Sequence, residues 1–91
     1  MTMEEKKESL IEFPARFPIK VMGVRHDDFS QTIFEVVRIH APDLTAEDIE
    51  LRVSSGGNYI SLTVTVTAIS QEQLDNIYRA VTGHPMVKYV L

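Results

Sequence analysis

The sequence contains no cysteine, and this absence removes several kinds of chemistry at once. Disulfide bonds, thiolate metal sites and cysteine nucleophiles are all excluded, because each requires a cysteine sulfur. The absence also fits a reducing compartment, where disulfide bonds are rare. We therefore expect neither a disulfide framework nor a cysteine-based active site.

Long apolar runs are missing as well. No stretch approaches the ~18 consecutive apolar residues that a transmembrane helix needs. The first residues, Met1 to Glu8, lack the basic-then-apolar order of a secretory signal peptide. We expect a cytoplasmic protein with no membrane partner.

Clustered positive charge is the third absence. The formal net charge is −4, and the nine Lys and Arg residues are scattered along the chain. Proteins that bind the nucleic-acid backbone need clustered basic residues, so we expect no nucleic-acid partner. Base stacking on RNA also needs exposed aromatic residues on the central strands. The outward positions predicted there are Lys20, Met22, Ser61, Thr63 and Thr65, and none is aromatic.

What the sequence does contain is the residue mix of one small globular domain, with 44% hydrophobic and 24% charged residues in 91. Residues 1–9 are charged and poor in apolar side chains, so we predict a flexible N-terminal segment there. Residues 10–91 form the single folded domain. Pro14 and Pro18 are expected to make its entry extended.

Hydrophobic periodicity predicts six elements in this domain. Asp27 or Asp28 is expected to cap the first helix, and Pro42 stops it. Ser70 is expected to cap the second helix and to form a capping box with Gln73. The predicted order is strand 19–24, a helix ending at residue 40, strands 49–53 and 59–68, a helix between residues 70 and 83, and strand 87–91.

This βαββαβ order predicts an α+β ferredoxin-like sandwich. Four antiparallel strands form one layer, and two helices cover one face of it. In strand 59–68, Ile60, Leu62, Val64 and Val66 alternate with small polar residues, so we expect these four to face the helices.

The other face of the sheet has no cover within the chain. It is either a hydrated β-surface or a docking face for a protein partner or a second copy. The edge strands are open as well, and strand 49–53 has only Glu50 and Arg52 to discourage pairing. Phe34 lies off the apolar face of its helix, where it either anchors a partner or covers the sheet edge. The interface candidates are Lys20, Met22, Arg52, Ser61, Thr63, Thr65 and Phe34.

Catalytic motifs are lacking. Among the three histidines, His26, His40 and His84, none stands in a nucleophile or metalloprotease motif. We interpret His40 as half-buried on the apolar helix face and His84 as a turn residue. The sequence predicts no enzyme activity, no cofactor and no metal.

One polar cluster, Arg25-His26-Asp27-Asp28, follows the first strand. Helix N-termini attract anions, and an arginine can bind a carboxylate or phosphate through two hydrogen bonds. Three interpretations stay open. The aspartates only cap the helix, or the loop both caps and binds a small ligand, or His26 and the aspartates hold a metal ion. Three consecutive loop residues rarely converge on one ion, which makes the third the weakest.

Several short motifs resemble the YbeD-like family of short bacterial proteins of unknown function. The resemblance covers residues 10–91, and its motifs are specific as a combination. These motifs are Glu12-Phe13-Pro14, Phe17, Lys20-Val21-Met22-Gly23, His40-Ala41-Pro42, Ser54-Ser55, Gly57-Asn58-Tyr59 and Val90-Leu91.

The resemblance implies the same fold, close to ACT-type regulatory modules. Such modules bind amino acids or other small effectors at the loop after the first strand. The usual loop has an acidic residue before its glycine, whereas Met22 precedes Gly23 here. The candidate ligand-binding residues are Gly23, Val24, Arg25, His26, Asp27 and Asp28.

We therefore predict a non-catalytic regulatory or adaptor module. It would bind a small anionic or amino-acid-like effector, contact a protein partner, or do both. The alternative is a small phosphate- or acyl-phosphate-binding hydrolase that uses Arg25. That alternative rests on a weak similarity of Val21-Met22-Gly23-Val24 to the phosphate-binding loop of acylphosphatases.

Overall fold

Two long strands form the centre of the sheet in the computed structural model, which describes residues 12–91. β1 (Ala15–Val24) and β3 (Tyr59–Ala68) pair antiparallel along their whole length. β2 (Ile49–Val53) pairs with the outer side of β3, and β4 (Val87–Val90) with the outer side of β1. The resulting strand order is β2-β3-β1-β4. The segment 1–9, predicted to be flexible, lies outside the described residues.

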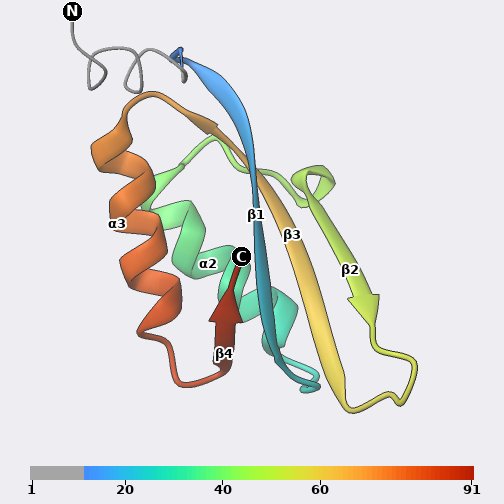
Figure 1. Ribbon diagram of the computed structural model, residues 1–91. Helices are drawn as coiled ribbons and strands as arrows, with labels where there is room; N and C mark the ends of the chain where they lie inside the picture. The colour runs from blue at the N-terminus through green and yellow to red at the C-terminus, as the bar shows by residue number, and fades with distance from the viewer. Residues whose placement is uncertain (1–11) are drawn as a thin grey trace, which may run out of the picture.

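Two helices, α2 (Phe29–His40) and α3 (Gln71–Thr82), pack on one face of this sheet (Figure 1). The predicted α+β ferredoxin-like fold is confirmed. A short 3-10 helix, η1 (Ala46–Asp48), precedes β2 and was not predicted. Figure 1 shows β2 at the edge of the sheet farthest from α3. None of the described helices is long and apolar enough to cross a membrane.

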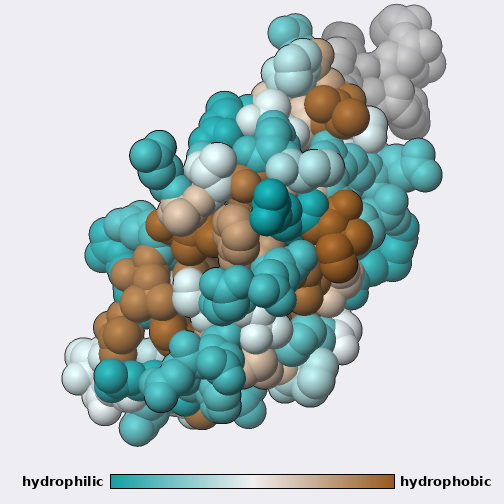
Figure 2. Space-filling model, turned by 180° about the vertical axis from the view of Figure 1, so that it is seen from behind, coloured by the Kyte–Doolittle hydropathy of each residue, from teal (hydrophilic) through white to brown (hydrophobic). Residues whose placement is uncertain are grey.

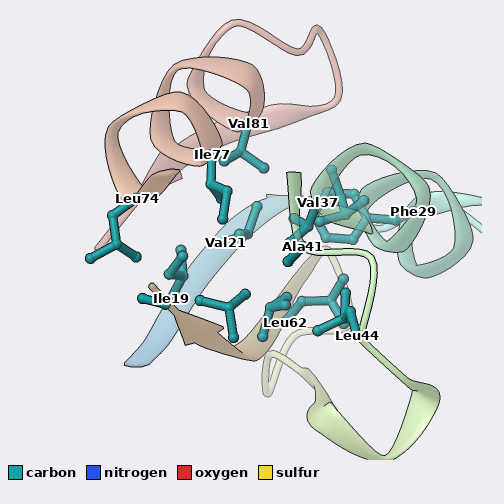
Figure 3. Packing of buried hydrophobic residues seen from close by; sticks show 14 of the residues in the cluster. Ile19, Val21, Phe29, Val37, Ala41, Leu44, Leu62, Leu74, Ile77 and Val81 are labelled. Atoms are coloured by element: carbon teal, nitrogen blue, oxygen red, sulfur yellow. The ribbon is translucent and has the colours of Figure 1, made fainter. Parts of the chain in front are cut away.

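The alternation of β3 decides which face of the sheet is buried. Leu62 and Val64 are fully buried beneath the helices, whereas Ser61, Thr63 and Thr65 are half-buried on the opposite face. The predicted orientation of β3 is therefore confirmed. Figure 3 shows apolar side chains from α2, α3 and the sheet meeting between the two layers. Each fully buried aliphatic side chain contributes roughly 1.5–3 kcal/mol relative to its exposed state.

β1 begins at Ala15 rather than at the predicted Ile19, so Pro18 lies inside the strand. The backbone N–H of Lys20 donates to the carbonyl oxygen of Leu91, which shows that this side of β1 faces β4. The nitrogen of Pro18 faces the same side, because it lies two residues earlier. The pairing with β4 extends no farther than Leu91, so the missing N–H of Pro18 leaves no ladder bond unmade.

The start of α3 is capped by Ser70, whose Oγ accepts a hydrogen bond from the Gln73 N–H at 3.1 Å as predicted. The second half of the capping box differs from the prediction. Gln73 Oε1 accepts from the N–H of Ile69 at 2.7 Å, and Gln73 Nε2 donates to the carbonyl oxygen of His40 at 2.8 Å. Gln73 therefore joins the start of α3 to the end of α2, where His40 is half-buried as predicted.

Candidate functional site

The loop between β1 and α2 lies beside the connection from α3 to β4. The two segments meet because β4 pairs with the end of β1. Between them is an open depression of about 400 Å³. It is lined by Val24, Arg25, His26, Pro85, Met86, Val87 and Lys88.

The charged side chains around this depression are basic. Arg25 and His26 come from the loop, and Lys88 comes from β4. None of the residues that line the depression is a carboxylate. The Arg25 guanidinium makes one long hydrogen bond, from Nη1 to the carbonyl oxygen of Gly57 at 3.5 Å. An anion in the depression would therefore meet two exposed cations and an imidazole.

The predicted helix cap by an aspartate is wrong. Asp28 occupies the N-cap position of α2, but its side chain makes no capping hydrogen bond. Instead, His26 organises the loop. Its Nδ1 accepts from the Asp28 N–H at 3.0 Å, and its carbonyl oxygen accepts from the Phe29 N–H at 3.1 Å. Asp27 and Asp28 are exposed and lie outside the lining of the depression.

Gly23, also predicted to bind a ligand, is buried and lies outside the lining. A Cβ atom at this position would lie 2.3 Å from the Met86 carbonyl oxygen and 2.6 Å from Cε1 of Phe29. The register between β1 and β4 also shifts between Met22 and Gly23. The glycine is therefore needed for the close approach of β1, β4 and α2.

Six of the predicted interface residues share the open face of the sheet. In the register, Lys20 lies opposite Thr63, and Met22 lies opposite Ser61. Arg52 lies on the other side of Ser61, on β2. Thr65 follows on the same face of β3. The structure thus brings these residues together on one surface, and the partner predicted for it stays a prediction.

Two tyrosines on this open face were missed. Tyr59 starts β3 with 49% of its surface exposed, and Tyr89 pairs with Met22 and is 52% exposed. Together with Met22, Gly23, Ser54 and Lys88 they surround a second depression of about 400 Å³. The expectation that the outward positions of the central strands carry no aromatic residue is therefore wrong, because Tyr59 of β3 is one of them. The period-two pattern of β3 already placed Tyr59 outward, and that signal was available.

Phe34 lies on a different surface from the other interface candidates. It is half-buried against the core, and the Arg38 guanidinium lies 5.9 Å from its ring centre. With Ile49 and Leu51 it lines a groove of about 220 Å³ between α2 and β2. Of the two interpretations left open, the structure favours the one in which Phe34 covers the sheet edge.

An ion pair joins the ends of three segments on the open face. Arg16 of β1 donates to Thr67 of β3 at 2.9 Å and to Oδ1 of Asp48 at 2.7 Å. The N–H of Thr45 donates to the other oxygen of Asp48 at 3.0 Å. These bonds, Arg16 first, hold the pKa of the Asp48 carboxyl below its ordinary value. Elsewhere, burial raises the pKa of Tyr78.

The interpretation of His26 and the aspartates as a metal site, the weakest of the three, finds no support in the loop geometry. Within residues 12–91, no three His, Asp or Glu side chains come close enough together to hold a metal ion. In the loop, Nδ1 of His26 is directed at the backbone of Asp28 instead.

Comparison with known proteins identifies relatives along the whole domain. A family model described as "Protein of unknown function (DUF493)" matches residues 8–91. A UPF0250 protein from Chromobacterium violaceum is 64% identical over 89 residues, which are 98% of this chain and 100% of that protein. UPF0250 proteins from Janthinobacterium sp. and Neisseria gonorrhoeae are 60% and 58% identical over 91 residues, covering all of both chains.

Among solved structures, the solution structure of protein HP0495 from H. pylori is similar in fold. It matches with a TM-score of 0.73 and covers 100% of this chain and 96% of that one. Its sequence is only 15% identical, so this similarity supports the fold alone. Because the family model spans the domain and the relatives match along their full length, the chain belongs to the DUF493 family of UPF0250 proteins, the YbeD-like proteins that its motifs resemble.

Proposed function

We propose that the protein is a non-catalytic regulatory module that acts in the cytoplasm and binds a small anionic effector in the depression beside the β1–α2 loop. One observation carries the proposal. Arg25, His26 and Lys88, from two separate segments, line the same depression without a carboxylate among its lining residues. Charge-assisted hydrogen bonds from such groups to a carboxylate or phosphate are roughly twice as strong as neutral ones.

The chemistry of these lining residues favours binding of an anion without its hydrolysis. Hydrolysis needs a positioned nucleophile or general base next to the group that holds the substrate. The lining supplies two permanent cations and one imidazole, and His26 Nδ1 already accepts from the Asp28 N–H. This arrangement can neutralise and orient an anion, and it offers no carboxylate to activate water. The hydrolase that would use Arg25 is therefore the weaker candidate.

Calorimetric titration with inorganic phosphate, acetyl phosphate and short-chain carboxylic acids tests the proposal. We expect at least one of them to bind, and Arg25→Ala to weaken that binding by about tenfold or more, because a charged hydrogen bond contributes about 1.5–3 kcal/mol. Lys88→Ala should act in the same direction. Arg79→Ala is the matched control, since it removes an exposed charge on α3.

Two outcomes contradict the proposal. Equal weakening by Arg79→Ala would mean that binding follows net charge and not this depression. Release of phosphate from acetyl phosphate that disappears in Arg25→Ala would favour the hydrolase.

We also propose that the open face of the sheet contacts a protein partner, so that the module acts as an adaptor. Half-exposed Tyr59 and Tyr89 beside Met22 support it, because aromatic residues and methionine are enriched in interfaces. In a pull-down from cell extract, Met22→Glu should abolish capture of such a partner. The midpoint of urea denaturation should stay unchanged. Unchanged capture by this variant would exclude the face.

A further inference from the structure

The outer edge of β2 presents unpaired backbone groups. The Ser54 N–H donates to the Tyr59 carbonyl oxygen at 2.9 Å, so Ser54 forms a hydrogen-bonded pair with β3. Such pairs recur at every second residue of an antiparallel ladder. Glu50 and Arg52 therefore bond to β3, whereas the N–H and C=O groups of Leu51 point away from the sheet. The backbone groups of Val53 and the carbonyl group of Ile49 point the same way, while the Ile49 N–H already donates to the carbonyl oxygen of Ala46.

The helix-side face of this edge is apolar, and beyond the part that Phe34 covers it is half-exposed. Leu51 and Val53 pair with buried residues of β3, yet they are 45% and 44% exposed. Figure 2 shows apolar side chains over β2 at the left of the molecule in this view. They lie at the edge that Figure 1 shows farthest from α3. An exposed edge strand with apolar side chains is a template for pairing with another chain.

The opposite face of β2 carries one charge of each sign. Glu50 and Arg52 lie two residues apart, and Arg52 Nη2 donates to Glu50 Oε2 at 3.2 Å. Both side chains are mostly exposed. If β2 pairs antiparallel with an identical strand about Leu51, Glu50 of each copy faces Arg52 of the other. Leu51 then faces its own copy, and Ile49 faces Val53.

We propose that β2 forms this antiparallel pair with β2 of a second copy, which joins two sheets into one across a two-fold axis. The pairing gives the outward N–H and C=O groups of Leu51 matching partners in the second copy, and it lets the Val53 N–H donate to the Ile49 carbonyl oxygen. It also places Glu50 and Arg52 at non-hydrogen-bonded positions, where opposite side chains come closest.

The charges of Glu50 and Arg52 favour this pairing register over registers shifted by two residues. A shift of two residues in one direction places Glu50 opposite Glu50, and the same shift in the other direction places Arg52 opposite Arg52. Like charges directly opposite one another are destabilising. A shift of one residue would put the apolar set on the polar face. The surface charges therefore set the partner and the register. Each exposed pair contributes at most about 1 kcal/mol, but the two-fold axis creates two such pairs, and reversing the sign at one position turns both into repulsions.

This association goes beyond the proposed effector binding and does not depend on it. The basic depression involves β4, at the opposite edge of the sheet from β2. Sedimentation equilibrium of the full chain, from micromolar to millimolar concentration, tests the pairing. We expect a reversible dimer whose dissociation constant rises by about tenfold or more in Glu50→Arg and also in Arg52→Glu. The combined variant should restore it, because the two charges then face one another with their signs exchanged.

Asp75→Arg is the matched control. It makes the same change in net charge as Glu50→Arg, on the exposed surface of α3, and should leave the dimer unchanged. Circular dichroism and the urea midpoint of each variant show whether the fold is intact. A monomer at every concentration would overturn the proposal. A dimer equally stable in all variants, or one that the combined variant fails to restore, would overturn it as well. Titration of Glu50→Arg with phosphate tests effector binding separately.

Discussion

Replacing Gly23 by alanine tests how tightly the two layers approach one another. The added Cβ would lie 2.3 Å from the backbone oxygen of Met86 and 2.6 Å from the ring of Phe29. Phe29 is fully buried, so its ring has no free space to move into. The chain must therefore move at the irregular junction of β1 and β4. Overpacking of this kind costs about 1–3 kcal/mol, and more in some cases.

One opposing effect reduces this loss. Gly23 does not adopt a positive φ, so alanine can take its conformation and restricts the unfolded chain. That contribution is about 0.4–1 kcal/mol. Since the blocking atom belongs to the backbone, we expect the overpacking to be near its upper range. The net loss of unfolding free energy should be about 2 kcal/mol.

Urea denaturation followed by circular dichroism measures this loss. Gly56→Ala is the control, because the nearest atom to its added Cβ is 3.8 Å away and belongs to the side chain of Asn58. Its unfolding free energy should stay within about 0.5 kcal/mol of the parent protein. If Gly23→Ala were as stable as Gly56→Ala, the close approach would not exist and the assignment of Gly23 to packing would be wrong.

Two further predictions concern the core and the ion pair. Leu62→Ala should cost roughly 2–5 kcal/mol in urea denaturation, because the fully buried side chain leaves a cavity. The same change at Leu51, its half-exposed neighbour on β2, should cost far less at low protein concentration. Asp48→Asn should lower the urea midpoint at neutral pH, because Arg16 stabilises the carboxylate. A group with a lowered pKa stabilises the fold above its ordinary value, here 3.8, and loses that contribution as the pH falls through the lowered pKa. The two midpoints should therefore converge at acid pH, and a constant difference would contradict the assignment.

The fold could be predicted because the alternating apolar residues of β3 indicate which face of the sheet is buried. Five alternating apolar residues from Ile60 to Ala68 fit only one face of a strand, and the structure buries all of them. The start of β1 was harder to predict, because Pro18 usually argues against a strand. It is tolerated here only because β4 ends before reaching it, and that depends on the three-dimensional pairing.

The candidate site was predictable in part. Arg25 and His26 stood out from the sequence because they belong to a polar cluster between the first strand and the first helix, where an anion can bind. Lys88 was not linked to them, because only the pairing of β4 with β1 brings it to the same depression. Asp28 makes no capping hydrogen bond, and the loop is instead held by His26, which accepts from the N–H groups of Asp28 and Phe29. Which backbone N–H groups a loop side chain reaches is decided by loop geometry, which composition does not encode.

The most direct test of effector binding is a nuclear magnetic resonance titration of the ¹⁵N-labelled protein with acetyl phosphate. We expect saturable shifts in the amides of Val24 to Asp28 and of Met86 to Lys88, the two segments beside the depression. These shifts should be lost in Arg25→Ala, and the acetyl phosphate should stay intact during the measurement. Saturable shifts confined to other segments, no saturable shifts, or hydrolysis that requires Arg25 would contradict effector binding without turnover in this depression.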